Sequence, residues 1–155
     1  MLLATPAAAE DADDRAEARQ ELTADRAKAA DLRQVTERGK NLSDMRLGLF
    51  AIHLLNEMSD GDAVLYGFVH RDDHSTIGYL EEVFQYHSSE EVAALEALGP
   101  EPHRQVARAA LEMLRHIPDG AEPPETQARD RGDLAAALAR LEAALKVVLD
   151  GIPQD

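Results

Sequence analysis

The sequence predicts an all-α fold, a compact bundle-like domain of five to seven helices. Apolar residues make up 45% of the 155 residues, yet aromatic residues make up only 4% and tryptophan is absent. Much of the apolar content is therefore alanine, which favours helices packed through small side chains over sheets. The length is that of one domain with a sizeable core. We expect a single helical domain over residues 10–155, preceded by a flexible tail over residues 1–9.

The first predicted helix spans residues 10–38 and ends near Gly39. Its composition of Ala, Glu, Asp and Arg is typical of a helix. Its apolar stripe is thin, because it consists only of Leu22, Ala29, Leu32 and Val35. A helix of this kind either lies against the domain along a narrow seam or packs on another chain.

The second predicted helix runs to Met58, with Asn41 or Ser43 as its N-cap. Apolar residues occupy nearly all of its sides, which predicts the buried centre of the fold. Residues 63–70 fit a short strand or a helix, and we favour the helix. Further helices are expected over residues 75–87 and over residues 88–99.

The C-terminal part contains two more predicted helices, separated by a Pro-rich loop over residues 118–132. The first begins near Pro102 and reaches Ile117. The last begins at Asp133, and its large apolar residues recur at spacings of 4, 3, 4 and 3, as in a heptad repeat: Leu134, Leu138, Leu141, Leu145 and Val148. This seam packs either on its own domain or on a neighbouring subunit.

Charge and composition exclude several classes of function. The net charge of −14 argues against nucleic acid and anionic membranes as partners, because both require a cationic surface. The absence of cysteine excludes disulfides, thiol nucleophiles and thiolate-held metal centres. No stretch reads as a secretion signal or a membrane span, so we expect a cytoplasmic protein.

Acidic residues are concentrated in the middle of the chain. Residues 51–100 contain ten Asp or Glu residues against one basic residue, Arg71. Such a surface can recognise a basic protein partner, and four glutamates are candidates for that contact: Glu81, Glu82, Glu90 and Glu91. The same region holds four of the six histidines, so carboxylate and imidazole groups can also bind a metal there.

Two pairs of possible metal ligands have helical spacing. His53 and Glu57 are four residues apart, as are His70 and His74, so each pair lies on one face if its segment is helical. Imidazole with carboxylate suits iron, manganese or zinc. The run from His53 to His74, about 22 residues, resembles in order and separation the two central helices of the hemerythrin family. That resemblance implies a four-helix bundle with a di-iron site, although no histidine precedes His53 as a counterpart of the family's first ligand.

Two functions follow as expectations. The first is a non-enzymatic scaffold, adaptor or accessory subunit, without catalytic residues or a cofactor, that forms a homo-oligomer or joins a larger complex. Its expected contacts are the four glutamates and the apolar residues of the terminal helices: Leu22, Leu32, Val35, Leu134, Leu138, Leu141, Leu145 and Val148. The alternative is a helical metal-binding protein that uses His53, Glu57, His70 and His74.

Overall fold

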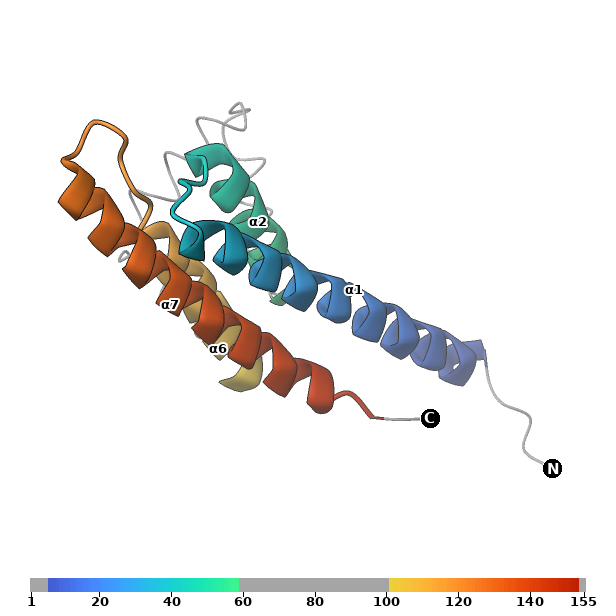
Figure 1. The fold of residues 1–155 in the computed structure, drawn as a ribbon. Coiled ribbons are helices and arrows are strands. Elements are labelled where there is room, and N and C mark those ends of the chain that lie inside the picture. The colour runs from blue at the N-terminus through green and yellow to red at the C-terminus, as the bar shows by residue number, and fades with distance from the viewer. Residues whose placement is uncertain (1–5, 59–100, 154–155) are drawn as a thin grey trace.

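A computed structural model describes residues 6–58 and 101–153, and these two ranges form four α-helices without a strand. They are α1 (Pro6–Glu37), α2 (Asp44–Met58), α6 (Glu101–Leu114) and α7 (Pro124–Asp150), shown in Figure 1. The all-α prediction is confirmed for these ranges. The helices expected over residues 63–99 lie outside them, so the predicted number of five to seven helices is not tested. None of the described helices is long and apolar enough to cross a membrane.

Helix α1 begins and ends where the local sequence favours it. It starts at Pro6, earlier than the predicted residue 10, because proline is well suited to the first turn and three alanines follow. Only part of the predicted tail therefore precedes the helix. Gly39 ends it with a φ of 81°, a conformation that glycine adopts without strain. The amides of Gly39 and Lys40 donate to the carbonyls of Thr36 and Val35, as in a Schellman motif.

Helix α7 is longer than the sequence predicted. The expected loop over residues 118–132 ends at Pro123, and the helix starts at Pro124 instead of Asp133. Proline in the first helical turn loses no hydrogen bond, because that amide has no partner inside a helix. Glu125 adds a favourable negative charge in the same turn. The Pro-Pro pair therefore initiates the helix, and the predicted loop over residues 118–132 is wrong at this point.

Helix α2 begins after a serine cap, one of the two caps that the sequence allowed. The Ser43 hydroxyl accepts a hydrogen bond from the Arg46 amide at 3.1 Å. We expect Ser43→Ala to lower the free energy of unfolding by about 1 kcal/mol, because this amide then has no partner inside the helix. Urea unfolding followed by far-UV circular dichroism measures the change. An unchanged unfolding midpoint would show that the cap contributes nothing to stability.

The four helices pack in the spatial order α1, α7, α6, α2. The closest backbone approaches are α1 with α7, α7 with α6, and α6 with α2. Helices α1 and α7 run antiparallel, so the start of α1 and the end of α7 lie at the same end of the bundle (Figure 1). There the Arg19 guanidinium donates to the Pro153 carbonyl at 2.8 Å, and further along the two helices Arg33 pairs with Glu142.

The core lies between these helices and is closed mainly by leucine. Phe50 is the largest side chain in it. Helix α7 contributes the heptad seam, whose residues are buried within this same chain. Helix α2 is amphipathic in this arrangement, not buried on every side, because Met45 and Leu49 are exposed. Helices α1 and α2 are not one of the three closely packed pairs, and polar side chains connect them.

Candidate metal centre

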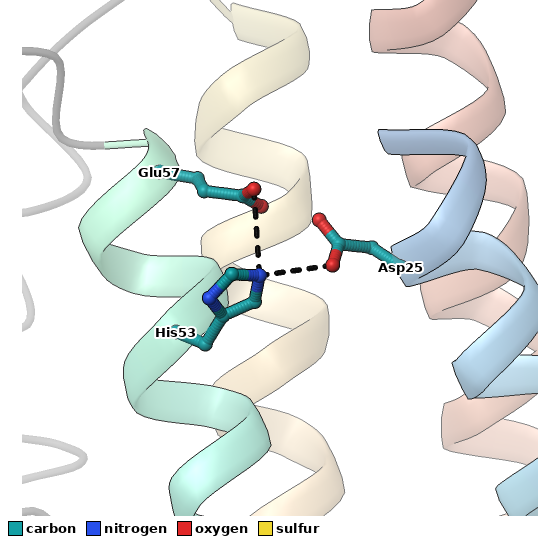
Figure 2. A group of neighbouring side chains, drawn as sticks. All are labelled: Asp25, His53 and Glu57. Carbon is teal, nitrogen blue, oxygen red and sulfur yellow. Dashed lines mark hydrogen bonds and ion pairs between the residues drawn. The ribbon is translucent and has the colours of Figure 1, made fainter. Parts of the chain in front are cut away.

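Three ligand-type side chains meet between α1 and α2. Asp25 lies on the apolar stripe of α1, three residues after Leu22 and four residues before Ala29, so its carboxylate faces the interior. His53 and Glu57 lie one helical turn apart on the facing side of α2. Figure 2 shows the three side chains converging, with one imidazole nitrogen of His53 toward the carboxylates and the other away from them.

The distances between these side chains are short. The His53 Nε2 atom lies 2.9 Å from Asp25 Oδ1 and 3.4 Å from Glu57 Oε1 (Figure 2). One ligand atom from each of the three residues lies within 4.8 Å of the other two. Because a carboxylate only accepts hydrogen bonds, His53 donates its Nε2 proton to Asp25 in this arrangement.

Most of the oxygen atoms in the cluster are buried without a donor. Asp25 is 8% exposed and Glu57 is 14% exposed, whereas His53 is 52% exposed. Asp25 Oδ2 and both carboxylate oxygens of Glu57 have no hydrogen-bond partner within the described ranges. Buried polar atoms normally have such partners, and each unpaired atom carries a desolvation cost. These three oxygen atoms are therefore suited to share a proton or to bind a cation.

The electrostatics of Glu57 agree with this view. Burial raises the pKa of Glu57 to about 9, and the neighbouring carboxyl groups of Asp25 and Glu21 add to the increase. Near neutral pH the metal-free protein consequently keeps Glu57 as a carboxylic acid, whose proton Asp25 can accept in a hydrogen bond. A cation at the same place would instead stabilise Glu57 as a carboxylate.

The arrangement fits the first coordination shell of a transition metal. Metal bonds of about 2.0 to 2.2 Å place neighbouring ligand atoms of a tetrahedron or octahedron about 2.8 to 3.6 Å apart. The two separations from His53 Nε2, 2.9 and 3.4 Å, fall in this range. One imidazole and two carboxylates suit iron, manganese or zinc. Three protein ligands leave at least one coordination position for water or another molecule.

The structure brings together only part of the predicted ligand set. His53 and Glu57 share one face of α2, as their spacing predicted, whereas His70 and His74 lie outside the described residues. Their proposed role as ligands stays a prediction. Asp25 was not predicted as a ligand from the sequence, because the predicted ligands were histidines and pairs of residues with helical spacing. The signal was a charged residue on the apolar stripe of α1.

The residues predicted for a protein interface are placed differently. Glu81, Glu82, Glu90 and Glu91 lie outside the described ranges. Seven of the eight predicted apolar residues are buried inside this chain, and Val35 is partly buried: the seven are Leu22, Leu32, Leu134, Leu138, Leu141, Leu145 and Val148. The C-terminal seam thus packs on its own domain, the intramolecular alternative. Self-association through the terminal helices stays a prediction.

Comparison with known proteins adds no relative. No protein-family model, curated protein or solved structure matches this chain. The short resemblance to the hemerythrin family therefore does not extend to a family match. The geometry of Asp25, His53 and Glu57 is therefore the feature that points to a function.

Proposed function

We propose that this chain is a metal-binding helical protein that holds a divalent transition metal between α1 and α2, with Asp25, His53 and Glu57 as its ligands. The observation that carries the proposal is the set of buried carboxylate oxygens without hydrogen-bond donors beside His53 Nε2. A divalent cation satisfies all of these atoms at once and compensates both carboxylates. This is the second of the two functions expected from the sequence, with Asp25 as a new ligand.

A proton shared by the carboxyl groups is the competing explanation. Protonated Glu57 can donate to Asp25 Oδ2, and this one hydrogen bond gives two of the three buried oxygen atoms a partner. One oxygen atom of Glu57 then still has no partner within the described ranges, whereas a cation contacts ligands on both helices. The proton therefore describes the metal-free state, and metal uptake replaces it.

Titration of the purified 155-residue chain, without an affinity tag of histidines, tests the proposal. We expect about one Zn²⁺ or Mn²⁺ per chain, with Zn²⁺ bound more tightly in accordance with the usual order of divalent metals. Asp25→Asn should weaken Zn²⁺ binding by about tenfold to 100-fold, because it removes a charged ligand but keeps the size of the side chain. Isothermal titration calorimetry measures both the stoichiometry and the affinity.

Asp31→Asn is the matched control. Asp31 lies on the same helix as Asp25 but is exposed to solvent, so its replacement should leave Zn²⁺ binding unchanged. Equal weakening by both substitutions would show that Zn²⁺ responds only to the general negative charge. Absence of stoichiometric binding in the unmodified chain would refute the metal proposal.

A further inference from the structure

A cleft of about 610 Å³ opens beside the candidate metal centre. It lies at the end of the bundle where α1 begins and α7 ends, which can be found in Figure 1. Its walls come from the first half of α1 and from the ends of α2, α6 and α7. The volume is in the range of small-molecule sites. Apolar side chains make up much of the lining: Leu22, Met58, Val147, Val148, Ile152 and Pro153.

The charged groups of this cleft are mostly acidic. Among the described residues, three acidic side chains line it, from Asp14, Glu21 and Glu57, together with Arg15 and His103. Arg15 already interacts with other groups of the chain. The carboxyl groups of Glu21 and Glu57, from adjacent helices, interact with one another, so two acids share one wall. Because Glu57 is a carboxylic acid in the metal-free protein, Asp14 and Glu21 supply the negative charge of the cleft, which repels an anionic head group.

We propose that the cleft binds a small organic cation, a primary ammonium group on an apolar body. Charge complementarity places the ammonium beside Glu21, which is exposed and can accept its hydrogen bonds. The apolar walls then remove the body of the ligand from water. A ligand with both parts matches the cleft, because the ammonium pairs with an acidic side chain and the apolar body contacts the apolar walls.

This site overlaps with the metal centre but is not the same site. Glu57 belongs to both, whereas Asp25 and His53 do not line the cleft. Zn²⁺ at Glu57 adds positive charge next to the ammonium at Glu21, so bound Zn²⁺ should weaken ammonium binding and the ammonium should weaken Zn²⁺ binding by the same factor. The Asp25→Asn variant separates the two proposals, because it should lose Zn²⁺ affinity and keep ammonium affinity.

The test compares three probes that share one tail and differ in the head group: n-octylammonium, n-octanol and n-octanoate. Each is titrated below its micelle concentration into the metal-free 155-residue chain near neutral pH. We expect saturable binding of one n-octylammonium per chain, about tenfold tighter than n-octanol, with n-octanoate weakest. Equal or tighter binding of n-octanoate, or the absence of saturable n-octylammonium binding, would overturn the proposal.

Two substitutions locate the site. Glu21→Gln should weaken n-octylammonium binding by about tenfold, because it removes a charge-assisted hydrogen bond. Glu17→Gln is the matched control: it removes the same charge from an exposed position of α1 that does not line the cleft. Ala18→Phe places a ring in the cleft and should weaken n-octylammonium and n-octanol alike. Equal effects of Glu21→Gln and Glu17→Gln, or no effect of Ala18→Phe, would place the ligand elsewhere.

Discussion

Glu57→Gln is expected to stabilise the metal-free protein by about 1 to 3 kcal/mol at mildly alkaline pH, while it weakens Zn²⁺ binding by at least about 100-fold. Glu57 is a buried acid with two unpaired oxygen atoms, and glutamine keeps its shape without a charge to bury. Glutamine also retains a donor for the Asp25 carboxylate. A substitution that strengthens the fold and removes ligand binding identifies a residue retained for function.

The stabilisation should depend on pH in a defined direction. The pKa of Glu57 is about 9 in the folded protein, against the ordinary value of 4.5 in the unfolded chain. Between these values the folded protein holds a proton that the unfolded chain has released, so the free energy of unfolding falls as pH rises. Glutamine does not titrate. The advantage of Glu57→Gln is therefore absent below about pH 4.5, grows with pH, and levels off above about pH 9.

Urea unfolding at several pH values in this window measures the difference in unfolding free energy between the metal-free unmodified protein and the metal-free Glu57→Gln variant. Glu142→Gln is the contrasting control, because Glu142 pairs with Arg33 between α7 and α1, and its loss leaves that guanidinium paired only within its own helix, with Glu37. It should destabilise the protein, as expected for an acid that supports the fold. Destabilisation by Glu57→Gln at every pH would instead make Glu57 a structural acid.

The parts of the fold that the sequence predicted correctly are those set by local periodicity and capping. The seam from Leu134 to Val148 is buried as its spacing predicted, and Gly39 follows the helix that it was expected to end. The beginning of α7 was wrong, because a Pro-Pro pair is compatible with a loop and with a first helical turn. Local sequence alone does not separate those two outcomes.

The candidate site was only half predictable, for a physical reason. His53 and Glu57 belong to one helix, so their spacing alone places them on one face. Asp25 lies 28 residues before His53 in the sequence, on a different helix. Its contact with His53 depends on the packing of α1 against α7 and of α2 against α6. Its place on the apolar stripe of α1 agrees with its burial, but it was not predicted as a ligand from the sequence. Its position opposite His53 required the tertiary structure.

Zn²⁺ affinity is expected to rise by about tenfold for each pH unit between about pH 6 and pH 9, and to level off above that range. The pKa of Glu57 is about 9, so below this value every bound metal must first displace the Glu57 proton. Between pH 6 and pH 8 the change amounts to about 100-fold from this one group. Lower pH therefore releases the metal while the helices remain folded.

Calorimetry checks this directly, because Zn²⁺ titrations in buffers with different heats of ionisation count the protons released. At least one proton per Zn²⁺ should leave the protein near neutral pH. The Glu57→Gln variant carries no proton at this position, so its weak residual affinity should depend less steeply on pH by about one proton. An identical pH dependence in both chains would mean that Zn²⁺ binds elsewhere, because a ligand with a raised pKa must report its own proton when the metal arrives.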